Sequence, residues 1–371
     1  MEKKPLILDG HKLLWHPERL KAWLNGERIA PITIDCALTR RCNYRCIYCY
    51  GQLQENDEKK MTKDVICRFL DDAAEIGVKA ISFVSDGEST CSKHIYDAII
   101  HGKDNGLDMA LGTNGVLLDI EKLPLILPKL TYLRFNISAA TASRYAQVHG
   151  CKESDYYKLT DIIKTAVEIK KKQSLEVTLG LQMVLLPSFK DQILPLAILG
   201  KDLEVDYTII KHCSDDENSS LGINYKEYIS TEITDLLRKA EDISDDKYLV
   251  KAKWSKILSQ GKRRYTHCYG PAFIMQLSGS GLVAPCGMLF NTKYNRFHIG
   301  NIAETSFKEI WQSKRYWDVL SDLASNKFNP QTDCGTLCLQ DRVNEFLWDL
   351  KQGNIELKVP TGPKPMHVNF I

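Results

Sequence analysis

Three cysteines stand close together in the segment TRRCNYRCIYCYGQ, at Cys42, Cys46 and Cys49. In a reducing compartment, thiols at such spacing are typical ligands of a soft metal, and tetrahedral zinc and iron–sulfur clusters are the two candidates. Zinc sites usually pair a CxxC with a second CxxC or with histidines, and no such partner lies near these residues in the sequence. Three thiolates suit a four-iron cluster with one iron left open, and Arg40, Arg41 and Arg45 would help to hold a cluster with net negative charge. The alternative is three unrelated loop cysteines.

The spacing Cys42-x3-Cys46-x2-Cys49 resembles the CxxxCxxC signature of the radical S-adenosylmethionine (SAM) superfamily, including an aromatic residue, Tyr48, before the last cysteine. The resemblance implies that the open iron binds the amino and carboxylate groups of SAM. One electron from the cluster would cleave SAM, and the 5′-deoxyadenosyl radical released would abstract a hydrogen atom from a substrate. The resemblance also places Tyr48 on the adenine, and it implies a one-electron reductant such as a flavodoxin or ferredoxin.

A second motif, Ser85-Asp86-Gly87-Glu88, follows the second predicted strand, where the family has a glycine–glycine–glutamate motif that contacts the SAM amino group. Asp86 replaces the first glycine, so Gly87 and Glu88 are the positions carried over. A carboxylate at Glu88 would pair with the ammonium in a site shielded from water, whereas the alternative is a turn with an exposed acid. Polar residues at strand ends are further candidates for the ribose or carboxylate of SAM, with strand-cap hydrogen bonding as the alternative: Asn114, Asn136 and Ser138.

Four more cysteines lie near the C-terminus, at Cys268, Cys286, Cys334 and Cys338. Four thiols complete one iron–sulfur cluster or one structural zinc site. Together with the segments 299–302 and 307–311, they resemble the C-terminal auxiliary-cluster extension of many radical SAM enzymes, which exists in a long (SPASM) and a truncated (twitch) form. The cysteines are too few for the two clusters of the long form, so one auxiliary [4Fe–4S] cluster is expected. A zinc knuckle or loose core thiols are the alternatives.

The elements that must position these residues alternate between short apolar runs and amphipathic stretches. This alternation predicts βαβ units and a parallel sheet. We expect an α/β fold, a full or partial parallel (β/α)6 barrel with a small C-terminal α+β domain, and ligands at the carboxyl ends of the strands. Strands are predicted at 32–38, 80–84, 109–113, 133–138, 177–186 and 206–211, and helices at 62–76, 94–105, 155–172 and 191–199.

Composition divides the chain further and excludes some partners. The predicted parts are an N-terminal extension (1–30), the core barrel (31–215), linking helices (216–260), the auxiliary-cluster domain (261–345) and a C-terminal tail (346–371). Lys plus Arg number 49 and Asp plus Glu number 47, a net charge of +2 that leaves no electrostatic footprint for nucleic acid or an anionic membrane. The sequence has neither a signal segment nor a membrane-length apolar run, so a cytoplasmic protein is expected.

The outcome for the substrate depends on the fate of the radical after hydrogen abstraction. Cys213 comes just after the sixth predicted strand, and its thiol could return a hydrogen atom to the substrate, giving epimerisation; the alternative is a strand-capping cysteine. An electron passed to the auxiliary cluster would instead give dehydrogenation. About 30 residues precede the first strand, too few for a peptide-recognition domain, which favours a small sugar- or nucleotide-like substrate. The alternatives are a peptide-modifying maturase and a non-catalytic, structural metal-binding module.

Overall fold

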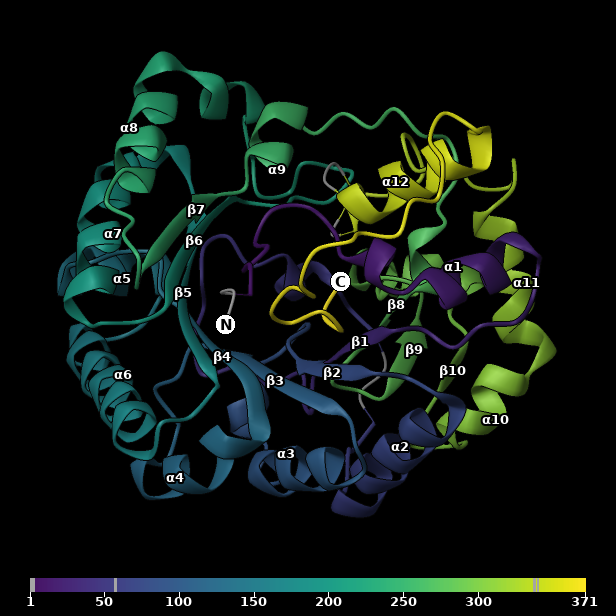
Figure 1. The fold of residues 1–371 in the computed structure, drawn as a ribbon, viewed down its shortest axis with the longest axis horizontal. Helices are drawn as coiled ribbons and strands as arrows, with labels where there is room; N and C mark the ends of the chain where they lie inside the picture. Colours follow the sequence, from purple (N-terminus) through teal and green to yellow (C-terminus); the bar gives the residue numbers. More distant parts are fainter. Residues whose placement is uncertain (1–3, 57–58, 336–337, 339) are drawn as a thin grey trace.

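A computed structural model describes residues 4–56, 59–335, 338 and 340–371. Within these residues, ten strands form one curved sheet in the order β10-β9-β8-β1-β2-β3-β4-β5-β6-β7. The strand order is linear, so the sheet is an open, partial barrel (Figure 1). The strands are β1 (Thr33–Cys36), β2 (Ala80–Phe83), β3 (Asp108–Thr113), β4 (Leu130–Asn136), β5 (Thr178–Leu185), β6 (Tyr207–His212), β7 (Leu249–Ala252), β8 (Ile274–Leu277), β9 (Leu282–Ala284) and β10 (Gly300–Asn301).

The helices cover the outer face of the sheet from α2 to α8, and the barrel interior faces the centre of the view (Figure 1). The helices are α1 (Pro17–Leu24), α2 (Lys63–Ile76), α3 (Ile95–Asp104), α4 (Leu123–Ile126), α5 (Ala142–His149), α6 (Glu153–Gln173), α7 (Ile193–Asp202), α8 (Thr231–Glu241), α9 (Trp254–Ser259), α10 (Phe307–Gln312), α11 (Lys314–Leu323) and α12 (Asp341–Gln352). No helix in the described part of the chain is both long and apolar enough to span a bilayer.

The predicted fold class is confirmed, because the six predicted strands correspond to β1–β6 and their neighbours pair in parallel. Local chemistry sets the ends of the elements. In α2, the Thr62 hydroxyl accepts a hydrogen bond from the N–H of Val65, and Gly77 ends the helix with a φ of 98°. The C-terminal part joins the same sheet, since β8 pairs in parallel with β1 while β9 and β10 are antiparallel.

Two segments differ from the sequence pattern. The stretch 216–260, expected to be helical, also contributes β7, which pairs in parallel with β6. Four residues are too few for their alternating burial to stand out in a charged region. The end of the expected tail packs under the barrel, where the Phe370 ring lies 5.0 Å from the ring of Tyr132. The Thr33 hydroxyl donates to the carbonyl of Asn369 at 2.6 Å, so this segment closes the amino ends of the strands.

Candidate active site

The loop that follows β1 carries Cys42, Cys46 and Cys49 at the carboxyl end of the strand. Cys42 is exposed, and the other two thiols are half-buried. Burial raises the pKa of Cys42 to about 11, and the nearby Glu88 and Cys49 raise the pKa in the same direction. Burial also raises the pKa of Cys46, with Cys49 and Cys42 as further causes. The three thiols are therefore electrostatic neighbours, and a donor set of sulfur alone fits an iron–sulfur cluster.

Two glycines clamp the start of this loop. A Cβ atom on Gly87 would lie 1.9 Å from the carbonyl oxygen of Thr39, and one on Gly279 would lie 2.1 Å from its carbonyl carbon. Real Cβ atoms do not approach a backbone this closely, so the loop passes between two positions that only glycine can occupy. The motif after β2 and the turn after β8 thus fix the same stretch of backbone.

Asp86, which departs from the family motif, links the two halves of this clamp. Its buried carboxylate accepts hydrogen bonds from the Ser278 hydroxyl at 2.5 Å and from the N–H of Gly279 at 2.9 Å. Arg40 Nε lies 3.6 Å from the same carboxylate. A glycine at this position could make none of these contacts, so Asp86 ties the cysteine loop to the C-terminal part of the sheet.

Glu88 is buried and held in one orientation. Its Oε1 accepts hydrogen bonds from the N–H and hydroxyl of Thr90 and from the hydroxyl of Thr113, at 2.7 to 3.0 Å. Its Oε2 accepts from the N–H of Asn114 at 2.8 Å. The Asn114 side chain in turn donates to Asn43 Oδ1 in the cysteine loop at 2.8 Å. Gly87, Glu88 and Asn114 therefore lie together beside the loop, and their contact with SAM stays a prediction.

On the other side of the loop, His149 at the end of α5 contacts the predicted cluster ligand Cys46 and two predicted SAM contacts, Tyr48 and Ser138. The N–H of Ser138 donates to His149 Nε2 at 3.0 Å, so the ring proton lies on Nδ1. His149 Nδ1 lies 3.2 Å from Cys46 Sγ and 3.4 Å from the hydroxyl of Tyr48. The Ser138 hydroxyl also donates to the Tyr48 hydroxyl at 3.3 Å. His149 could not be found from the sequence, because a lone histidine gives no pattern signal.

This contact gives a first prediction. A hydrogen bond to a ligating thiolate stabilises the more negative, reduced form of an iron–sulfur cluster. In the reconstituted protein, His149→Phe is therefore expected to shift the midpoint potential of the SAM-binding cluster to a more negative value. A potentiometric titration followed by electron paramagnetic resonance measures the shift, with His101→Phe on α3 as the control. An unchanged potential in His149→Phe would contradict the prediction.

The second set of thiols also converges. Burial raises the pKa of Cys268, Cys286 and Cys334, and the nearby Cys338 raises all three further. Cys334 also raises the pKa of Cys268 and of Cys286. Asn344 on α12 donates to Cys338 Sγ at 3.6 Å. Within the described residues, no three His, Cys, Asp or Glu side chains stand close enough to hold a single metal ion. The four-thiol donor set fits an iron–sulfur cluster, and its ligand assignment stays a prediction.

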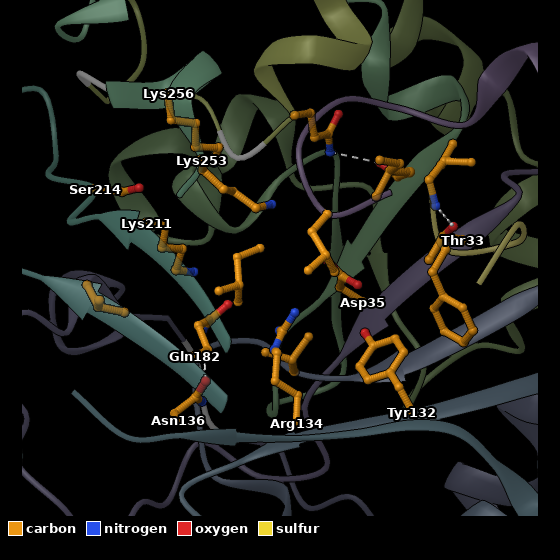
Figure 2. Close-up of a pocket in the computed structure, with 18 of the residues that line it drawn as sticks. Thr33, Asp35, Tyr132, Arg134, Asn136, Gln182, Lys211, Ser214, Lys253 and Lys256 are labelled. Atoms are coloured by element: carbon orange, nitrogen blue, oxygen red, sulfur yellow. Dashed lines mark hydrogen bonds between the residues drawn. The ribbon is translucent and has the colours of Figure 1, made fainter. Parts of the chain in front are cut away.

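A cavity of about 350 Å³ lies inside the barrel, between the cysteine loop and the C-terminal segment. Tyr48 and Cys49 line it on one side, and Phe370 and Ile371 line it on the other. Figure 2 shows charged and amide side chains from the strands and from the β7–α9 junction projecting into it: Asp35, Arg134, Asn136, Gln182, Lys211 and Lys253. Asn136, a predicted SAM contact, accepts a hydrogen bond from the Gln182 side chain at 2.8 Å.

Asp35 on β1 is the acid that faces this cavity. Gln276 lies on β8 and pairs with Asp35 in the sheet, and its side chain donates to Asp35 Oδ2 at 3.1 Å. Burial raises the pKa of Asp35 to about 6, against the opposing effects of Gln276, Arg134 and Lys211. A carboxyl group with a pKa near neutrality can exchange a proton with a bound molecule at working pH. No motif in the sequence had pointed to this residue.

The Cys213 side chain packs in the hydrophobic core and does not line the cavity. Its thiol is fully buried and lies 3.5 Å from the carbonyl oxygens of Tyr48 and Ser214. Burial raises its pKa to about 12. His212 and Ser214 line the cavity on either side of it, whereas the Cys213 side chain packs in the core. These contacts account for Cys213 as a structural residue, and its role as a hydrogen-atom donor stays untested.

Comparison with known proteins gives two family matches. The model of the radical SAM superfamily matches residues 37–195, which include the cysteine loop and the motif after β2. The model of an iron–sulfur cluster-binding domain (SPASM) matches residues 268–339, which hold the second set of cysteines.

Among curated proteins, the chain is 24% identical over 314 residues to a tungsten-containing aldehyde ferredoxin oxidoreductase cofactor-modifying protein from Pyrococcus furiosus, covering 80% of this chain and 85% of that protein. It is 26% identical over 316 residues to an AdoMet-dependent heme synthase from Methanosarcina barkeri, covering 79% and 85%. Among solved structures, Streptococcus suis SuiB bound to S-adenosylmethionine matches with a TM-score of 0.63 at 15% identity, over 81% of this chain and 70% of that one. AnSMEcpe with bound AdoMet matches with a TM-score of 0.57 at 15% identity, over 88% and 100%.

Proposed function

This chain carries a radical SAM domain followed by a SPASM iron–sulfur cluster-binding domain, and from that premise we propose that it oxidises a small molecule held in the barrel cavity. Its cofactors are SAM, a SAM-binding [4Fe–4S] cluster and an auxiliary iron–sulfur cluster. Cys42, Cys46 and Cys49 would hold the first cluster, and the four C-terminal thiols the second. When bound, the first cluster supplies the electron that cleaves SAM to a 5′-deoxyadenosyl radical. The second cluster would accept the electron that leaves the substrate.

The cavity supports a small-molecule substrate. A volume of about 350 Å³ lies at the lower end of the range for ligand pockets. The sheet wall surrounds it, and the residues around Phe370 close the amino ends of the strands. Tyr48 and Asn136, two predicted SAM contacts, line the same cavity, so SAM and the substrate would lie side by side in it. The space left beside SAM suits a small sugar- or nucleotide-like molecule, and a peptide substrate would have to insert a single side chain.

One observation favours dehydrogenation over epimerisation. Two residues that line the cavity also contact the auxiliary ligand Cys338: the N–H of Gln340 donates to Cys338 Sγ at 3.3 Å, and Lys256 Nζ donates to its carbonyl at 3.3 Å. The auxiliary site therefore borders the cavity, whereas the Cys213 thiol does not line it. Loss of a hydrogen atom, an electron and a proton together amounts to a two-electron oxidation, such as alcohol to ketone. Asp35 is the group placed to take the proton.

Anaerobic reconstitution tests the proposal. We expect about eight iron atoms per chain and an absorbance band at roughly 400 nm, as two four-iron clusters require. Reduction with dithionite in the presence of SAM should release 5′-deoxyadenosine, and a screen of small molecules should find one that increases its yield and is itself oxidised. Bound zinc without the absorbance band, or no 5′-deoxyadenosine, would refute the proposal.

The double variant Cys334→Ala plus Cys338→Ala is expected to lose about half of the iron, from about eight to about four atoms per chain. The SAM-binding cluster would remain, so dithionite-driven release of 5′-deoxyadenosine should persist while product formation is lost. Iron analysis and product quantification measure these effects. Cys67→Ala plus Cys151→Ala is the matched control and should keep all of the iron. An unchanged iron content in the first variant would disprove the four-thiol assignment.

A further inference from the structure

Positive charge dominates the wall of the barrel cavity. Arg134 from β4, Lys211 from β6 and Lys253 from the β7–α9 junction project into it (Figure 2). Lys12 and Lys256 line it as well. Among the described residues that line the cavity, Asp35 supplies the one side-chain carboxylate. Lys12 and Lys256 donate to the backbone carbonyls of Phe370 and Cys338, which leaves Arg134, Lys211 and Lys253 as the cations that project into the cavity opposite one carboxylate side chain.

The same wall holds polar groups without partners. In the part of the chain that the structure describes, His212 Nδ1 and Nε2, Arg134 Nε and the Ser85 hydroxyl are buried and make no hydrogen bond. The half-buried side chains of Lys211 and Lys253 face the same space. A buried polar group without a partner costs about 1–3 kcal/mol, so folded proteins rarely keep several around one space unless a ligand satisfies them.

The cations also act on one another. Burial lowers the pKa of Lys253 to about 7, and Lys256 and Arg134 lower it further. Burial lowers the pKa of Lys211 in the same way, again with help from neighbouring cations. An anion among these groups would relieve the repulsion and favour their charged forms.

We propose that the barrel cavity binds a substrate bearing at least two negative charges, which Arg134, Lys211 and Lys253 hold. This assignment rests on the proposed function, because it names the class of molecule that the enzyme oxidises. The carboxylate of SAM carries a single charge, whereas three cations, Arg134, Lys211 and Lys253, project into the cavity. Their number therefore exceeds what the cofactor alone can neutralise.

Carboxylate and phosphate groups share the chemistry that this cavity selects. Arg134 presents a planar guanidinium suited to two oxygens of either group, and each lysine supplies a point charge. His212, with two unpartnered ring nitrogens, adds a hydrogen bond to the same region.

Isothermal titration calorimetry on the reconstituted enzyme with SAM bound tests the proposal. The probes are succinate, inorganic pyrophosphate and the neutral succinamide. We expect at least one dianion to bind and succinamide not to bind, with succinate and pyrophosphate distinguishing carboxylate from phosphate recognition. Lys211→Met and Lys253→Met should each weaken dianion binding by roughly 10- to 100-fold, and Lys253→Arg should restore most of the affinity.

Lys314→Met removes a lysine whose side chain is 87% exposed on α11, and it should leave binding unchanged. Thermal unfolding controls for loss of fold, since removing one of several cations that repel one another should not lower the melting temperature of the substrate-free enzyme. Dianions that bind no better than succinamide would overturn the proposal. So would Lys253→Met and Lys211→Met variants that lose SAM affinity but keep dianion affinity, because the cations would then serve the cofactor.

The two proposals fail separately. If the wild-type enzyme releases 5′-deoxyadenosine from SAM but binds no dianion, the radical SAM activity stands and the substrate class is wrong. If it releases no 5′-deoxyadenosine, the proposed function itself fails, whatever the anions do.

Discussion

Replacing Asp35 by asparagine is expected to separate the cleavage of SAM from the oxidation of the substrate. The amide keeps the shape of the side chain and an oxygen for the hydrogen bond from Gln276, but it cannot take a proton. Loss of a general base typically costs 10²- to 10⁴-fold in rate. We therefore expect product formation to fall by roughly this factor, while dithionite-driven release of 5′-deoxyadenosine stays within about two-fold of the wild-type value.

The pH profile gives a second measurement on the same variant. The pKa of Asp35, raised to about 6, means that product formation should increase as the pH rises through 6 and the carboxylate ionises. The pKa of Lys253, lowered to about 7, means that binding of an anionic substrate should weaken above pH 7 as the ammonium loses its proton. In Asp35→Asn, the increase of product formation near pH 6 should disappear, because the group that ionises there is gone. The decrease in substrate binding above pH 7 should remain, because Lys253 is unchanged. The charged groups that face these two side chains are Arg134, Lys211, Lys256, Lys12 and Asp9.

Asp161→Asn on α6 is the matched control, because it makes the same exchange at a carboxylate that is 71% exposed and does not line the cavity. Its increase of product formation near pH 6 should remain. The substrate for these measurements is the molecule found by the 5′-deoxyadenosine screen. If Asp35→Asn forms product at the wild-type rate, Asp35 is not the proton acceptor.

The parallel sheet could be predicted from the sequence because its strands are short apolar runs between clear helical periods. The cysteine sets could be predicted because their spacing is local. The residues of the cavity were harder to find, since they are brought together from β1, β4, β6 and α9 only by the barrel. A usable signal did exist: Asp35, Arg134 and Lys211 are charged residues inside strands whose apolar members are buried. In a parallel barrel, such residues point into the interior.

Other features had no sequence signal at all. Asp86 looks like a defect of the family motif, and only its contacts with Ser278 and Gly279 explain it. Those partners lie almost 200 positions away in the chain. His149 and Lys253 sit in stretches where a single histidine or lysine is unremarkable. Their importance comes from burial and from what faces them, and both depend on tertiary structure.

Replacing Gly87 by alanine is expected to abolish assembly of the SAM-binding cluster. The new Cβ atom would lie 1.9 Å from the carbonyl oxygen of Thr39 and 2.8 Å from the Cα atom of Arg40, so the loop that leads to Cys42 must move. Gly279 packs against the other side of the same backbone, since a Cβ atom there would lie 2.1 Å from the carbonyl carbon of Thr39. The loop therefore cannot move away from a Cβ atom at position 87 without colliding with Gly279. Overpacking of this kind costs about 3 kcal/mol or more.

Iron in Gly87→Ala should fall from about eight to about four atoms per chain, as the auxiliary cluster remains. Release of 5′-deoxyadenosine should fall below detection. Gly362→Ala is the matched control, since its Cβ atom would meet nothing within 4 Å. It should keep both the iron and the activity. A Gly87→Ala enzyme with full iron and normal 5′-deoxyadenosine release would mean that the clamp does not position the cysteine loop, and that contacts elsewhere, such as those of His149, hold the loop in place.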